Sequence, residues 1–166
     1  MLPSVIGKYS LIFGFLISFP IFYYSLIDYK KSGNLNTKII SFSFLQLLFI
    51  LISFISLIIS FVISDFSNET VFNNSHTTKP LFYKITGTWG NHEGSLLLWL
   101  LVLTLFIFIF LIRSKHLLKN YRILTVIFQQ IIILGFLIFL ITSSSPFNYV
   151  SNNPKEGLGL NPILQD

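Results

Sequence analysis

The sequence predicts an all-α integral membrane protein with four transmembrane helices, and three features lead to this fold class. Charged residues make up only 10% of the 166 residues, whereas a soluble domain carries about 25%. Hydrophobic residues make up 53%, and the mean hydropathy is +0.76. The apolar residues lie in four long stretches, and a helix of roughly 20 apolar residues crosses a bilayer core. A soluble enzyme fold and a disordered chain are therefore excluded, and residues 1–166 are expected to form a single membrane domain.

The four predicted spans follow one another at residues 9–27, 39–63, 95–112 and 123–141. Pro20 interrupts the first span, where a membrane helix tolerates a proline as a kink. That span is too long for a cleaved signal peptide, and no small-residue cleavage site follows it. The second span has 25 uncharged residues and is long enough to tilt. The third and fourth spans, with 18 and 19 residues, are just long enough to cross.

The polar content of these spans limits the function classes. None of the four contains Asp, Glu, Lys, Arg or His. Pumps, channels and transporters usually depend on such groups inside the membrane, so this chain alone is not expected to form one. Gln46, Gln129 and Gln130 are the notable polar residues within the spans. We interpret them as hydrogen-bonding contacts between helices, with contact to a substrate as the open alternative. The chain has no cysteine, so disulfides, thiolate metal sites and cysteine nucleophiles are excluded.

The charges of the loops predict the orientation in the membrane. Residues 28–38 carry three lysines against one acid, and residues 113–122 carry four basic residues and no acid. Residues 64–94 carry two lysines against three acids. The positive-inside rule therefore places the two basic loops on the matrix or cytoplasmic side, with an outer loop at 64–94 and an outer carboxyl tail at 146–166. The basic residues behind the net charge of +5 thus set the orientation in the membrane, so membrane lipid is an expected partner and nucleic acid is not.

One dense polar and aromatic segment stands out at residues 83–95, YKITGTWGNHEGS, followed by Trp99. Asn91 is predicted to be the N-cap of a helix. Glu93 would then lie in the first turn, where the helix dipole favours an acid. A helix that begins there places His92, Ser95 and Trp99 on one face. Gly87, Gly90 and Gly94 would allow a second backbone or a flat ligand to approach closely. The candidate site residues are Trp89, Gly90, Asn91, His92, Glu93, Gly94, Ser95 and Trp99.

Simpler interpretations of this segment stay open. Trp89 and Trp99 fit the aromatic belt that anchors helices at the membrane surface. His92 fits a capping or hydrogen-bonding residue. It does not fit a zinc signature, because position 96 is a leucine where a second histidine is needed. The segment also lacks the strand and flanking glycine of a nucleophile elbow, so no metal site and no hydrolase are expected.

The segment resembles the first signature of the CcmF-type cytochrome c haem lyases of the system I maturation pathway. Further stretches with the same resemblance are 65–67, 73–75, 79–84, 142–147 and 160–166. Their order resembles the amino-terminal quarter to third of the family, as in the split forms of some mitochondria. The carboxyl-terminal stretch supplies four more family-motif residues: Asn161, Pro162, Gln165 and Asp166.

The resemblance implies a part in attaching haem covalently to apocytochrome c on the outer side of the membrane. The family's haem-ligand histidines have no counterpart here, so haem is expected to be bound by the assembled lyase and not by this chain alone. No catalytic residue is assigned, and the chain is expected to be non-catalytic by itself. The implied partners are the lyase polypeptides that carry the His-Pro-Pro and tryptophan-rich motifs, a haem-delivery protein and apocytochrome c.

Two further expectations concern location and an alternative role. Alanine is absent, and the abundant Phe, Ile, Leu, Asn and Lys have AT-rich codons, which favours an organellar genome and hence the mitochondrial inner membrane. If the genome is not organellar, the expected location is the bacterial plasma membrane. The alternative function is a small hydrophobic structural subunit of a respiratory-chain complex, which composition alone does not separate from a lyase fragment.

Overall fold

The computed structural model describes residues 2–31, 35–151 and 154–159 as an all-α protein. The elements in chain order are α1 (Leu2–Lys30), α2 (Thr37–Val62), α3 (Glu69–Asn74), α4 (Leu81–Gly87), α5 (His92–Arg113), the 3-10 turn η1 (Ser114–His116) and α6 (Lys119–Thr142). The helices α1, α2, α5 and α6 are each long and apolar enough to cross a membrane; for α5 the apolar segment extends through η1. The predicted fold class, with four long apolar helices, is confirmed.

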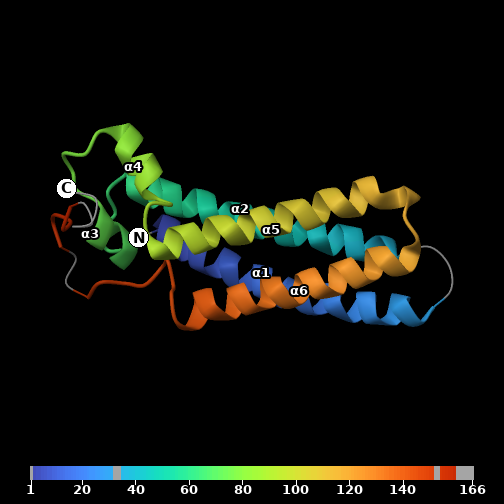
Figure 1. Ribbon diagram of the computed structural model, residues 1–166. Coiled ribbons are helices and arrows are strands. Elements are labelled where there is room, and N and C mark those ends of the chain that lie inside the picture. The colour runs from blue at the N-terminus through green and yellow to red at the C-terminus, as the bar shows by residue number, and fades with distance from the viewer. Residues whose placement is uncertain (1, 32–34, 152–153, 160–166) are drawn as a thin grey trace.

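The four long helices form an antiparallel bundle with short helices at one end (Figure 1). Helix α1 packs against α2 and α6, and both of these pack against α5. We call the end formed by residues 64–91, 143–151 and 154–159 the motif end, because it holds the start of α5 together with α3 and α4. The opposite end, where α1 ends and α6 begins, is called the basic end.

The helices continue beyond the uncharged stretches of the sequence. Helix α1 includes Lys8 and Lys30, and α5 includes the last residues of the polar segment, from His92 onward. Backbone hydrogen bonding favours helix in the polar interface as well as in the hydrocarbon, so the helix ends extend past the apolar runs. The segment 64–91 likewise contains α3 and α4 and is not a continuous loop.

Small residues bring α1 and α2 close together. The Ser53 hydroxyl donates to the backbone oxygen of Gly7 at 3.0 Å. A Cβ on Gly14 would lie 2.6 Å from the Ile50 side chain, which shows how closely α2 approaches there. Membrane helices associate through such close packing, because apolar burial gives no preference for a neighbouring helix over lipid.

The buried glutamines join three helices in the middle of the bundle. Gln130 of α6 donates through Nε2 to Oε1 of Gln46 on α2 at 3.0 Å, and Gln46 Nε2 donates to the Ser18 hydroxyl of α1 at 2.6 Å. Gln46 and Gln130 are fully buried, whereas Gln129 is half-buried. The predicted role in helix contacts is therefore confirmed for Gln46 and Gln130.

Replacing Gln130 with leucine is expected to lower the free energy of unfolding by about 1–2 kcal/mol, because the buried Gln46 amide then loses its partner on α6. Gln129→Leu is the matched control, since no hydrogen bond joins its side chain to another described residue. The measurement is helical circular dichroism in mixed micelles titrated with a denaturing detergent. Equal losses in both variants would contradict the contact.

Candidate functional site

Asn91 organises the junction between α4 and α5 at the motif end. Its side-chain oxygen accepts from the backbone N–H of Gly94 at 2.7 Å, which confirms it as the N-cap of α5. Its Nδ2 donates to the backbone oxygens of Gly87 at 2.8 Å and Thr88 at 3.1 Å. One buried amide therefore ties the end of α4 to the start of α5 and fixes the angle between them.

The close approach predicted at the glycines is confirmed for Gly94 alone. A Cβ at Gly94 would lie 1.6 Å from the backbone oxygen of Thr88. At Gly87 and Gly90 the nearest atoms lie 3.6 Å away, which is ordinary contact distance. The group that occupies the space at Gly94 is thus the chain's own backbone, which is the first of the two predicted alternatives.

His92 connects the start of α5 to the end of α6. Its Nδ1 lies 3.0 Å from the hydroxyl oxygen of Ser144, and its ring meets Phe139 edge to face at a centroid distance of 6.2 Å. Ser144 is buried, while His92 keeps an exposed side. The imidazole is therefore held by one fixed partner and one aromatic edge, with the rest of its surface accessible.

The aromatic residues of the segment are also accessible. Trp89 is 39% exposed and Trp99 is 61% exposed. Because α5 runs without interruption from His92, the helical spacing places His92, Ser95 and Trp99 on one face, as predicted. The Ser95 hydroxyl donates to the His92 backbone oxygen at 3.0 Å and so remains within the helix. We call the accessible residues of the segment the aromatic ledge: Trp89, which precedes α5, and His92, Ser95 and Trp99, which lie on α5.

A polar cavity of about 200 Å³ lies beside the ledge. Glu93 lines it from α5 and Glu69 from α3, and Ser143–Ser145 line it after α6. Glu69 and these serines were missed as site residues by the sequence reasoning. The motif resemblance at 142–147 could have marked the serines as site residues. Their position beside α5 follows only from the packing of α6 against α5.

The tail after α6 folds back over α3 and the residues that flank it. The Glu69 amide donates to the Asn148 oxygen at 3.0 Å, and the Val150 amide donates to the Ser67 oxygen at 2.9 Å. Hydrogen bonds from the Thr77 hydroxyl and backbone amide hold the pKa of the Glu156 carboxyl below its usual range. The predicted motif residues Asn161, Pro162, Gln165 and Asp166 lie outside the described residues.

The groups that the site offers are an exposed surface and polar side chains that can position a ligand. Within the described ranges, no group of three His, Cys, Asp or Glu side chains lies close enough together to hold a metal ion. The motif end therefore combines a rigid junction, an exposed aromatic ledge and a polar cavity.

Comparison with known proteins identifies the family to which this chain is similar. The chain is 46% identical over 121 residues to the cytochrome c-type biogenesis protein CycK of Bradyrhizobium diazoefficiens, which covers 73% of this chain and 18% of CycK. It is 34% identical over 164 residues to CcmF of Haemophilus influenzae, which covers 97% of this chain and 25% of CcmF. The chain belongs to the CcmF and CycK cytochrome c haem lyase family.

The structural comparison agrees with the sequence comparison. A solved structure titled cytochrome c haem lyase CcmF superposes on 92% of this chain with a TM-score of 0.81 and 26% identity. The chain covers 26% of that CcmF structure and 18 to 25% of the curated relatives described above. No family model matches the sequence. The four-helix bundle with its motif end is thus a portion of the larger haem lyase architecture.

Proposed function

We propose that this chain forms the amino-terminal part of a cytochrome c haem lyase and helps to attach haem covalently to apocytochrome c. The observation that carries the proposal is the 34% identity to CcmF of Haemophilus influenzae across 97% of the chain. The chain spans about a quarter of that relative or less, and we assign the remaining functions to the other parts of the lyase. These would carry the His-Pro-Pro and tryptophan-rich motifs and meet the haem-delivery protein.

The residues of the motif end support a positioning role. Covalent attachment adds the S–H of each apocytochrome thiol across a haem vinyl double bond, so that a C–S bond forms and the hydrogen goes to carbon. Such an addition gains most from holding its reactants in a fixed geometry. The aromatic ledge provides flat surfaces for a planar ligand, and Asn91 and Ser144 hold its backbone and imidazole in place. No haem ligand is assigned to this chain.

Depletion of the chain from its native membrane tests the proposal. The c-type cytochromes should lose their covalent haem, measured by haem staining of a denaturing gel, and re-expression should restore it. The alternative role, a structural subunit of a respiratory complex, predicts normal haem staining and the loss of one assembled complex on a native gel.

The orientation is part of the proposal: the basic end faces the matrix or cytoplasm and the motif end faces outward. Seven of the eleven lysine and arginine residues lie in residues 28–38 and 113–122, which supports this orientation. The membrane we propose is the mitochondrial inner membrane, supported by the absence of alanine and the abundance of residues whose codons are AT-rich.

Cysteine labelling provides the prediction that checks the orientation. The chain has no native cysteine, so single variants report one site each. Thr78 and Lys115 are the sites of choice because both are exposed, whereas Ser75 and Ser114 are buried. Thr78→Cys should react with an impermeant maleimide in intact mitoplasts, and Lys115→Cys should react only after the membrane is opened. The reverse pattern would refute the orientation.

The purified chain is expected to bind no haem in stoichiometric amount. None of the predicted spans contains a histidine, and His92 is already engaged with Ser144 at the surface of the bundle. The measurement is the pyridine haemochrome spectrum after size exclusion in detergent. One haem per chain would contradict the role proposed here.

A further inference from the structure

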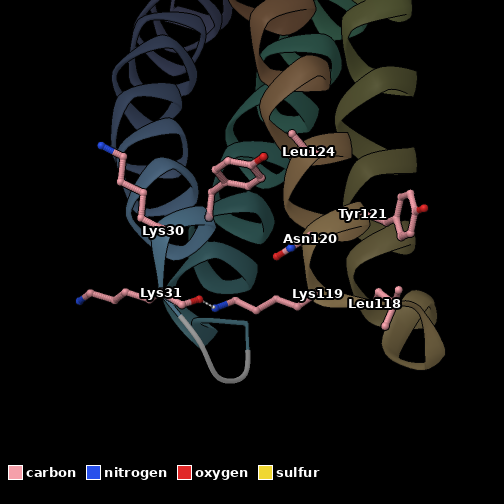
Figure 2. Close-up of a pocket in the computed structure, with 8 residues that line it drawn as sticks. Lys30, Lys31, Leu118, Lys119, Asn120, Tyr121 and Leu124 are labelled. Carbon is pink, nitrogen blue, oxygen red and sulfur yellow. Dashed lines mark hydrogen bonds between the residues drawn. The ribbon is translucent and has the colours of Figure 1, made fainter.

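A broad cleft lies at the basic end, between the end of α1 and the start of α6 (Figure 2). Its volume is about 660 Å³, and it lies far along the bundle from the aromatic ledge. Three lysines, two tyrosines, two leucines and an asparagine line it: Tyr29, Lys30, Lys31, Leu118, Lys119, Asn120, Tyr121 and Leu124.

The charge of the cleft is positive and uncompensated. Lys119 Nζ donates to the backbone oxygen of Lys31 at 2.9 Å, so the Lys119 side chain reaches from α6 to the end of α1, while the Lys31 side chain extends away from α6 (Figure 2). Lys30 and Lys31 extend outward at its rim. In the part of the chain that the structure describes, no carboxylate forms an ion pair with these lysines.

Among the described residues at this end, the acid Asp28 bonds to the backbone and forms no ion pair with the lysines of the cleft. Asp28 is buried, and its Oδ2 accepts from the backbone N–H of Asn36 at 2.6 Å. At the start of α6, no side chain caps the first turn, so its free backbone N–H groups add a further positive partial charge. The lysines of the cleft and the uncapped start of α6 favour a bound anion.

The apolar part of the cleft distinguishes a lipid from a soluble anion. Leu118 is 71% exposed and Tyr121 is 65% exposed, beside the basic residues of the first turn of α6. Tyrosine and lysine at the ends of apolar helices are typical of the headgroup region of a bilayer. Leu124 continues the apolar lining toward the membrane core. A free phosphate would use the cations and leave these apolar surfaces in water.

We propose that this cleft binds the phosphate headgroup of an anionic phospholipid, with the acyl chains lying against α1 and α6. Basic clefts between membrane helices at the bilayer surface recognise such headgroups through lysine contacts. The lysines supply the charge selectivity, and Leu118 and Tyr121 supply the selectivity for a molecule that has chains. This site is independent of the proposed haem attachment and lies at the opposite end of the bundle.

Native mass spectrometry of the full chain in detergent tests the proposal. The chain is titrated with phosphatidylglycerol, with phosphatidylcholine and with inorganic phosphate. The pocket variant is Lys30→Gln/Lys31→Gln/Lys119→Gln. The matched control, Lys38→Gln/Arg113→Gln/Lys115→Gln, removes the same charge from exposed residues at the same end but outside the cleft. Lys119→Gln alone is a milder variant, and circular dichroism verifies the helix content of each.

The wild-type chain should retain one phosphatidylglycerol in preference to phosphatidylcholine. The pocket variant should bind it roughly tenfold more weakly or worse, and the control should bind it like the wild type. Equal losses of phosphatidylglycerol binding in the pocket variant and the control would show that binding depends only on the total positive charge of this end. That result would overturn the proposed site. Saturable binding of inorganic phosphate that depends on the same three lysines would assign the cleft to a soluble anion and overturn the lipid proposal.

Discussion

Replacing His92 with alanine is expected to lower covalent haem attachment to cytochrome c roughly tenfold or more, with a near-normal amount of the chain in the membrane. The imidazole is exposed on one side, so its removal costs the bundle one hydrogen bond to Ser144 and an edge contact with Phe139. One such bond contributes about 1 kcal/mol, which four long helices tolerate. The measurement is a haem stain of cytochrome c beside an immunoblot of this chain.

Ser144→Ala is the matched control for His92, because it removes the same hydrogen bond and keeps the imidazole. If His92 acts only by joining α5 to α6, the two variants should behave alike. If the imidazole itself contacts a ligand, His92→Ala should be much the more severe. Trp89→Ala removes the second member of the aromatic ledge and should also reduce haem attachment. Normal cytochrome c in both His92→Ala and Trp89→Ala would leave the chain as a scaffold only.

Placing a side chain at Gly94 is expected to lower the amount of folded chain more than any other substitution in the segment. The Cβ of Gly94→Ala would lie 1.6 Å from the Thr88 backbone oxygen, and neither backbone segment can swing away as a flexible side chain could. Overpacking of this kind lowers the free energy of unfolding by about 1–3 kcal/mol. A clash with backbone is expected to reach the upper end of that range or exceed it. The Asn91 cap uses the Gly94 amide, so the start of α5 would be lost with it.

Gly135→Ala in the middle of α6 is the control for Gly94, because a Cβ there meets nothing within 4 Å. It should leave abundance unchanged, while Gly94→Ala and Gly94→Leu should both reduce it on an immunoblot and lower the midpoint of thermal unfolding in detergent. Full abundance of Gly94→Leu together with lost cytochrome c would contradict the packing argument. That outcome would favour a ligand at the glycine.

The local features of the site could be predicted from sequence because they depend on residues a few positions apart. Asn91 caps α5 through the amide of Gly94, three residues away. The same helix spacing places His92 and Trp99 on one face. By contrast, Ser144 is 52 residues from His92, and only the antiparallel return of α6 brings them together. No local pattern distinguishes Ser144 from the serines beside it.

At the basic end too, the sequence predicts the local charges, whereas the contacts they make depend on how distant helices pack. Arg122 was counted among the loop charges that set the orientation, yet it is buried and donates to the Leu111 backbone oxygen at 2.7 Å and to the Ser114 hydroxyl at 3.0 Å. It therefore provides a hydrogen-bond donor for a backbone carbonyl at the end of α5, as well as adding a positive charge. Sequence patterns do not predict the cleft near Lys119, because its two walls belong to α1 and α6, the first and last of the described helices.

The sequence by itself determined the all-α class, the four apolar helices and the distribution of charge between the two ends. These follow from the lengths of uncharged runs, because a bilayer core accepts only helices of about that length and repels charge. The tertiary structure alone decided that Gln46 meets Gln130, that Thr88 occupies the space at Gly94, and which residues line the two cavities. Such contacts depend on the rotation and register of packed helices, which interlocking side chains from all four helices set together.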